Sequence, residues 1–131
     1  TEDFFMQKKI IATTAAPAAI GPYSQAVSAN GFLYLSGMLA IDPASGTLVG
    51  EDAPAQARQI LKNISALLAS EGLSIDNVVK TTVFLTDLGA FVAVNAVYGE
   101  TFAGNPPARS CVEVSRLPKD ALVEIECVAV Y

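Results

Sequence analysis

The chain has 131 residues, of which 52% are hydrophobic and 16% charged, so it can bury one domain-sized core and is not a disordered chain. Eight Lys and Arg against thirteen Asp and Glu give a net charge of −5, which argues against a nucleic-acid-binding surface. The sequence has no histidine. This excludes Ser-His-Asp and Cys-His nucleophile systems and His-containing zinc sites.

The N-terminal region predicts one strand and a loop. Residues 8–13 are rich in β-branched side chains, and the Pro and Gly residues within 15–23 are typical of a loop. The apolar stretch that begins at residues 10–12 (IIA) is interrupted by Thr13, Thr14 and Pro17, too early for a signal peptide. It is also shorter than the ~18 apolar residues of a membrane span. Residues 1–5 precede Met6 and are either native or an expression remnant.

A hairpin and a further turn follow. Residues 25–28 and 32–37 predict two strands joined at Asn30-Gly31. That dipeptide favours a tight turn because both residues tolerate positive φ. Residues 42–46 (DPASG) predict another turn.

The first helix has the clearest signal in the sequence. Asp52 is a suitable N-cap, Pro54 fits the first turn, and Gly72 fits the position just past the C-terminal end. Between them the apolar residues recur at spacings of three and four, which makes one continuous helical stripe. The stripe consists of residues 53, 57, 60, 61, 64, 67 and 68.

The second half of the chain predicts a strand over 78–86, a second helix from an Asp87 cap to Gly104, and two strands over 108–115 and 121–131. The full order is β-β-β-α-β-α-β-β. We therefore expect one α+β domain over residues 1–131, with a mixed sheet and both helices packed on one face.

Side-chain alternation assigns the faces of the last two strands. In 121–131, Val123, Ile125 and Cys127 share one face, which predicts a core position for the Cys127 thiol. In 108–115, the apolar set with Val112 is expected to face the helices. The polar set on the helix-free face would then be Arg109, Cys111, Glu113, Glu124 and Glu126.

The same rule places further side chains on the helix-free face, namely Val78, Thr82, Phe84, Phe32 and Tyr34. That mixture is too apolar for a solvent-exposed surface. We therefore expect another subunit to cover it, with functional groups near the subunit boundary.

Four polar residues are candidates for chemistry, and each has a structural alternative. Arg109 matches a carboxylate with two parallel hydrogen bonds, and Glu124 can act as a general base if burial raises its pKa; the two could equally form a cross-strand ion pair. Cys111 is a weak candidate nucleophile because no histidine can take its proton. Asn95 lies on an apolar helical stripe and needs a hydrogen-bond partner, as a site residue or as a satisfied structural amide.

The C-terminal third carries a recognisable pattern. Residues 107–114 (PARSCVEV), followed by 117–120 (LPKD) and 123–126 (VEIE), resemble the signature of the RidA (YjgF) family of enamine/imine deaminases. The resemblance covers nearly the whole chain in six ordered blocks. The other five are 19–25 (AIGPYSQ), 35–37 (LSG), 56–59 (QARQ), 79–84 (VKTTVF) and 94–98 (VNAVY).

The resemblance implies a fold, an assembly and an activity. The fold is a small α+β domain shared in outline with a class of chorismate mutases, and the assembly is a homotrimer with three sites between subunits. The activity is hydrolysis of reactive 2-imino acids, such as 2-iminopropanoate and 2-iminobutanoate, to 2-oxo acids and ammonia. These imines arise from pyridoxal-phosphate-dependent dehydratases, and the deaminase itself is expected to need no cofactor or metal.

The resemblance also implies a role for each site residue. Arg109 would hold the substrate carboxylate, and Glu124 would orient or deprotonate the attacking water. The remaining substrate-binding residues would be Tyr23, closing over the site, Ser36 and Gly37, lining it, Asn95, supporting the opposite wall, and Cys111, contacting the substrate.

Other functions compete with this interpretation. The same arginine-lined cleft suits a non-catalytic protein that binds or senses 2-oxo acids or other small carboxylates. An RNA- or translation-related interaction protein is disfavoured by the acidic charge, and a redox-regulated chaperone would need a reachable Cys111 or amine. We expect a cytoplasmic protein with no nucleic-acid or membrane partner. The preferred imino acid stays open because one methylene changes preference by only ~1–3 kcal/mol.

Overall fold

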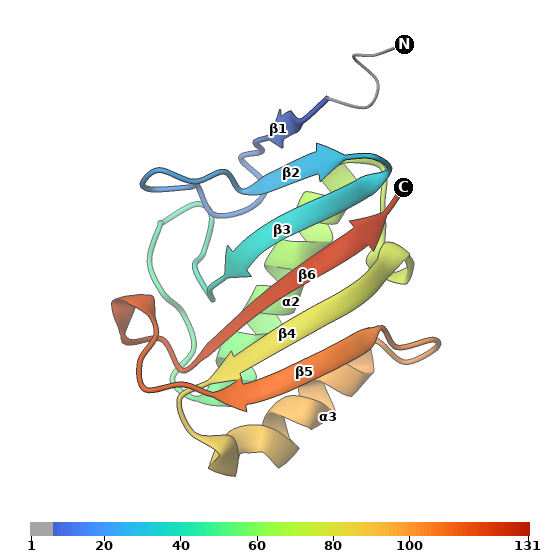
Figure 1. Ribbon diagram of the computed structural model, residues 1–131. Coiled ribbons are helices and arrows are strands. Elements are labelled where there is room, and N and C mark those ends of the chain that lie inside the picture. Colours follow the sequence, from blue (N-terminus) through green and yellow to red (C-terminus); the bar gives the residue numbers. More distant parts are fainter. Residues whose placement is uncertain (1–6) are drawn as a thin grey trace.

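The computed structural model describes residues 7–131, and a six-stranded sheet forms its centre (Figure 1). Every neighbouring pair of strands is antiparallel except β4 and β5, which run parallel. The spatial order is β1-β2-β3-β6-β4-β5. The strands are β1 (Lys9–Ile11), β2 (Ala26–Ala29), β3 (Phe32–Met38), β4 (Val78–Leu85), β5 (Ala108–Glu113) and β6 (Val123–Val130).

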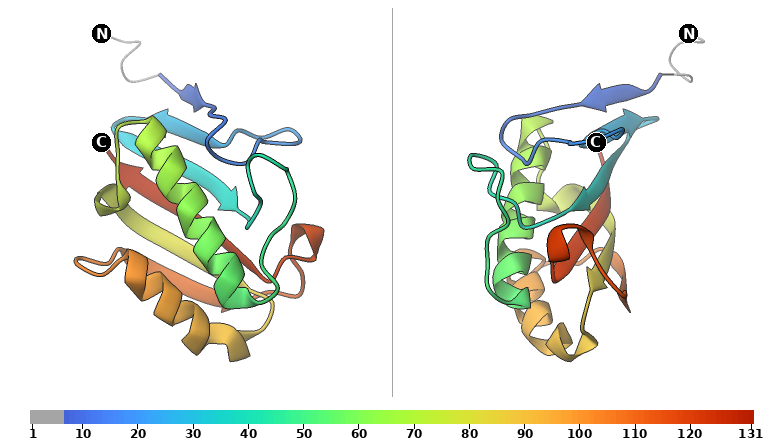
Figure 2. Two further views of the ribbon diagram at one scale, coloured as in Figure 1. Left: turned by 180° about the vertical axis from the view of Figure 1, so that it is seen from behind. Right: turned by 90° about the vertical axis from the view of Figure 1, so that its left-hand side faces the viewer.

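Two helices, α2 (Ala53–Ser70) and α3 (Phe91–Thr101), cover the same face of this sheet (Figure 2). Helix α2 packs against β6 and β3, while α3 lies beside α2 near β5. Within residues 7–131, no helix covers the opposite face (Figure 2). The α+β order and the mixed sheet predicted from the sequence are confirmed.

The sequence signals at the hairpin and the first helix are also confirmed. Asn30 has a φ of 51° and Gly31 a φ of 82°, the left-handed pair that a tight hairpin turn requires. The Asp52 Oδ1 accepts a hydrogen bond from the Ala55 N–H at 2.9 Å, and Gly72 follows α2 with a φ of 72°. The predicted apolar stripe of α2 is buried against the sheet.

The predicted start of the second helix needs a correction. Asp87 caps a short 3₁₀ turn over Leu88–Ala90, where its side chain accepts from the Gly89 N–H at 2.7 Å. Helix α3 begins only at Phe91, with no side-chain cap, and ends at Thr101 rather than Gly104. The cap and the helix therefore belong to two consecutive elements with different hydrogen-bond patterns.

The prediction for the faces of β5 was wrong. Arg109, Cys111 and Glu113 pair with Thr81, Val83 and Leu85 of β4, which are buried toward the helices. Paired residues share a face, so these three polar side chains lie on the helix side. The physical reason is that β5 is an edge strand, whose helix side is at most half-buried and therefore accommodates polar side chains.

The apolar member of β5 is instead exposed. Val112 lies on the helix-free face and exposes 41% of its surface. The prediction for Val78 was wrong as well, because an irregularity between Val78 and Lys80 shifts the register and buries Val78 against Ala129. Cys127 is buried in the core, as predicted.

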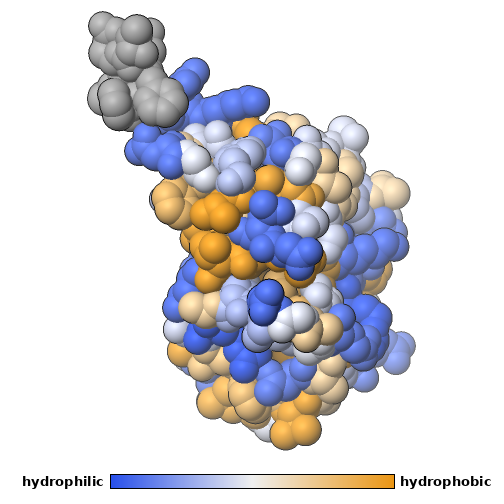
Figure 3. Space-filling model, turned by 90° about the vertical axis from the view of Figure 1, so that its right-hand side faces the viewer, coloured by the Kyte–Doolittle hydropathy of each residue, from blue (hydrophilic) through white to orange (hydrophobic). Residues whose placement is uncertain are grey.

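The rest of the helix-free face is as predicted. Glu124 and Glu126 pair with Phe84 and Thr82 there, and Phe32 and Tyr34 expose 39% and 48% of their surface. Figure 3 shows apolar surface gathered along one edge of the side that it presents. Across residues 7–131, no helix combines the length and apolar character that a membrane span would need.

A buried amide fixes the loop that precedes β2. Gln25 is 8% exposed, and its Nε2 donates to the carbonyls of Thr13, Ala16 and Pro17 at 2.9, 3.2 and 2.7 Å. Its Oε1 accepts from the Thr13 N–H at 2.6 Å. One side chain thus satisfies the backbone of a segment that has no regular hydrogen bonding, and it holds this segment against the sheet.

We expect Gln25→Leu to lower the free energy of unfolding by about 1–3 kcal/mol, because it leaves buried backbone groups without partners. Urea denaturation followed by circular dichroism measures this loss. An unchanged midpoint would show that the loop does not depend on the amide.

Candidate functional site

Four of the residues predicted for the site line one groove at the edge of the helix-free face. Tyr23 comes from the loop before β2, Ser36 and Gly37 from β3, and Glu124 from the start of β6. The groove has a volume of about 530 Å³. Its other walls are formed by Ala18, Ile20, Leu39, Ile41, Pro118 and Lys119.

Glu124 and Gly37 fit together within this groove. The Glu124 carboxylate lies directly against the Gly37 backbone, where a Cβ atom would overlap it. Gly37 therefore creates the space that the carboxylate occupies. Burial raises the pKa of Glu124, and the nearby Glu126 raises it further. A carboxyl group with this shift can hold or take up a proton closer to neutral pH than an ordinary glutamate can.

The loop side of the groove is organised by local hydrogen bonds. The Ser36 Oγ donates to the Ser24 carbonyl at 2.6 Å, and the Tyr23 hydroxyl accepts from the Ile20 N–H at 3.3 Å. Tyr23 nevertheless exposes 53% of its surface. Its ring therefore stands at the mouth of the groove and does not fill it.

The other three predicted residues form a second cluster, between β5 and α3, which we call the arginine cluster. The Arg109 Nη1 donates to the Asn95 Oδ1 at 2.6 Å. The guanidinium carbon lies 4.7 Å from the centre of the Tyr98 ring and 5.6 Å from that of Phe91. Cation–π contact and a charge-assisted hydrogen bond thus hold the arginine in place.

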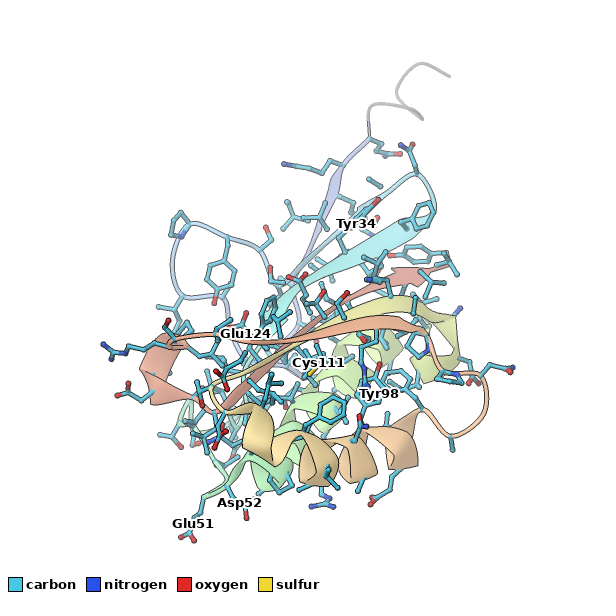
Figure 4. All side chains as sticks on the ribbon, turned by 60° about the horizontal axis from the view of Figure 1, so that its bottom comes forward. Tyr34, Glu51, Asp52, Tyr98, Cys111 and Glu124 are labelled. Carbon is cyan, nitrogen blue, oxygen red and sulfur yellow. The ribbon has the colours of Figure 1, made fainter. Side chains whose placement is uncertain are left out.

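Cys111 belongs to the same cluster but is not activated. Figure 4 shows Cys111 and Tyr98 close to α3, with Glu124 at the start of β6. Burial raises the pKa of the Cys111 thiol, an effect that the charge of Arg109 only partly opposes. The thiol is therefore protonated at neutral pH and is a poor nucleophile.

The structure excludes one structural alternative raised by the sequence and gives the partner in the other. Arg109 and Glu124 form no cross-strand ion pair, since β4 separates β5 from β6 and the two side chains lie on opposite faces of the sheet. Asn95 has its hydrogen-bond partner in Arg109, a predicted site residue, so both alternatives given for this amide fit the contact. One chain therefore brings the predicted residues together as two separate groups.

The aromatic platform of the arginine cluster was not predicted from the sequence. Phe91 and Tyr98 lie on the apolar helical stripe that also carries Asn95, and Thr81, which shares a hydrogen bond of 2.7 Å with the Tyr98 hydroxyl, is not among the candidate residues. A threonine at a core-facing position of a strand was the available signal. Within residues 7–131, no three Cys, Asp or Glu side chains gather closely enough to hold a metal ion.

Comparison with known proteins gives consistent matches over nearly the full chain. The family described as Endoribonuclease L-PSP matches residues 13–131. A protein of Salmonella typhimurium named 2-iminobutanoate/2-iminopropanoate deaminase is 51% identical over 125 residues, which cover 93% of this chain and 97% of the relative. A mouse protein of the same name is 48% identical, over 94% of this chain and 91% of its own length.

A solved structure has the same fold over nearly the full chain. The crystal structure of E. coli TdcF with bound serine superposes with a TM-score of 0.88 at 44% identity, covering 94% of this chain and 98% of TdcF.

The raised pKa of Glu124 predicts a pH-dependent effect of Glu124→Gln on stability. The protonated carboxyl contributes stability that is present below the ordinary glutamate pKa of about 4.3 and is lost as the pH rises through the higher folded-state value. We therefore expect Glu124→Gln to be more stable than the wild type near neutral pH, with the two converging in acid.

Urea midpoints across this pH range measure the difference. Glu51→Gln, at an exposed carboxylate far from the groove, serves as the control (Figure 4). A Glu124→Gln variant less stable than the wild type near neutral pH would contradict the prediction.

Proposed function

This chain belongs to the RidA (YjgF) family, and we propose that it hydrolyses short 2-imino acids, such as 2-iminopropanoate and 2-iminobutanoate, to 2-oxo acids and ammonia. Such imines are reactive by-products of pyridoxal-phosphate-dependent dehydratases. The observation that carries the proposal is the oriented guanidinium of Arg109, held by Asn95 and two aromatic rings. The close relatives named as deaminases of these same substrates support it.

The chemistry follows from the two groups of residues. Arg109 binds the substrate carboxylate through paired hydrogen bonds, which fixes the position of the neighbouring C=N carbon. Glu124 orients a water molecule and accepts its proton as the water oxygen bonds to that carbon and the C=N π electrons move onto the nitrogen of the protonated imine. The resulting carbinolamine collapses when its nitrogen takes up the proton that Glu124 carries and leaves as ammonia, while the hydroxyl gives its proton back to Glu124 and the C–OH becomes C=O.

The remaining site residues have supporting roles in this proposal. Tyr23 closes over the bound substrate, and Ser36 and Gly37 line its pocket. Cys111 contacts the substrate beside Arg109, while Asn95 holds the arginine. The reaction uses water and these side chains, and the proposal includes no cofactor or metal.

We infer that the complete site requires two copies of the chain. The groove lies at the helix-free face and the arginine cluster on the helix side, so one copy supplies Glu124 and a neighbour supplies Arg109. A homotrimer with three such sites would also cover the exposed Phe32, Tyr34 and Val112. The free thiols of Cys111 and Cys127 agree with a reducing compartment such as the cytoplasm.

We expect Arg109→Ala to abolish the activity, because charge-assisted hydrogen bonds provide much of the affinity for so small a substrate. A threonine dehydratase generates 2-iminobutanoate, semicarbazide traps it, and the wild type should suppress semicarbazone formation while the variant should not. Arg116→Ala removes an exposed arginine paired with Asp120 and should behave like the wild type.

Failure of the wild type to suppress trapping would overturn the deaminase assignment. Binding of 2-oxobutanoate without turnover would then identify a carboxylate-binding protein.

The two-copy site predicts complementation between inactive variants. Arg109→Ala and Glu124→Gln, each inactive alone, should regain about a quarter of wild-type activity when refolded together, the share of sites that random mixing completes. The semicarbazide assay measures this recovery. Refolding Arg109→Ala with an Arg109→Ala/Glu124→Gln double variant is the control and should restore nothing. A mixture as inactive as its parents would mean that both residues act within one chain.

A further inference from the structure

Tyr98 links the arginine cluster to the core of the domain. Its ring lies 4.7 Å from the Arg109 guanidinium, and its hydroxyl shares a 2.7 Å hydrogen bond with the Thr81 Oγ1. Thr81 is in turn the residue of β4 that pairs with Arg109 of β5. A strand pairing, a hydrogen bond and a cation–π contact thus join the three residues in a closed triangle.

The two hydroxyl groups of this triangle lie in the core. Tyr98 is 6% exposed and Thr81 1%, and burial raises the pKa of Tyr98, so its phenol stays protonated. Phe and Val would fill similar space without polar groups, and a buried pair of hydrogen-bonded hydroxyls adds little net stability over them. The hydrogen bond between the two hydroxyls does, however, fix the orientation of the Tyr98 ring.

The fixed ring restricts how Arg109 can meet a ligand. The Tyr98 ring lies within cation–π distance of the guanidinium, and Asn95 accepts from its Nη1. The N–H groups left over can still make the paired hydrogen bonds that a carboxylate accepts. An arginine fixed before the ligand arrives loses less side-chain freedom on binding.

We propose that Tyr98 is a positioning residue that holds the Arg109 guanidinium ready for a carboxylate, with Thr81 holding Tyr98. The proposal rests on the function proposed above, since it takes the ligand to be a 2-imino or 2-oxo acid. Tyr98 acts through Arg109 and touches no reacting atom.

The test is Tyr98→Leu, which keeps an apolar side chain but removes the nearer of the two rings beside Arg109. We expect it to weaken 2-oxobutanoate binding and to raise KM for 2-iminobutanoate by about 3- to 30-fold, the range of a cation–π contact. In the proposed function, Arg109 binds the carboxylate equally well in the ground state and in the transition state. The substitution should therefore change kcat far less than KM. Calorimetry measures the affinity for 2-oxobutanoate, and the semicarbazide assay measures KM and kcat for 2-iminobutanoate.

Two further variants separate positioning from stability. Tyr98→Phe keeps the ring but loses the hydrogen bond to Thr81, so its affinity for 2-oxobutanoate should lie between that of the wild type and that of Tyr98→Leu. Val97→Ala truncates a buried neighbour on α3 and should lower the melting temperature with affinity unchanged. The methyl ester of 2-oxobutanoate, which lacks the charge, should bind wild type and Tyr98→Leu equally weakly.

The outcomes for the wild type and the variants distinguish failure of the proposed deaminase function from failure of the positioning role of Tyr98. If the wild type neither binds 2-oxobutanoate nor hydrolyses the imine, the proposed function fails. If the wild type does both and Tyr98→Leu matches it, or if Val97→Ala loses as much affinity as Tyr98→Leu, the positioning role is overturned. Loss confined to kcat would also overturn it.

Discussion

The parallel pairing of β5 with β4 determines where the charged groups of this protein lie. All other strand pairs are antiparallel, and a reversed β5 would have a different register. In the register observed, Arg109 pairs with Thr81 and faces α3. Helix α3 then provides Asn95, Phe91 and Tyr98 as its neighbours. The Arg109 guanidinium and the groove that contains Glu124 are consequently placed on opposite faces of one sheet.

Local sequence signals were sufficient for most of the fold. The Asn30-Gly31 turn, the Asp52 cap and the stripe of α2 depend on neighbours a few residues away, and all three are present in the structure. The faces of β5 could not be derived in this way. Alternation shows which residues share a face, but it does not show which face meets the core. The apolar side chain of Val112 favoured the prediction that its face meets the helices, but Val112 lies exposed on the helix-free face.

The site residues were proposed from family resemblance, and the structure adds how they are grouped. Tyr23, Ser36, Gly37 and Glu124 share the groove, and Asn95, Arg109 and Cys111 share the arginine cluster. The contact between Gly37 and the Glu124 carboxylate was beyond prediction, because it joins two strands far apart in the chain. The same holds for the pair formed by Thr81 and Tyr98.

The separation of the groove from the arginine cluster also affects how such a protein can evolve. The groove walls include Ile20, which is 78% exposed, and Leu39 and Ile41, and none of them takes part in the hydrogen bond or ring contacts of Arg109. In the proposed function, a mutation in these walls changes the room for the variable end of a substrate, while Arg109 binds its carboxylate as before. Selection can then widen or narrow the range of accepted side chains in small steps, without rebuilding the carboxylate site proposed at Arg109.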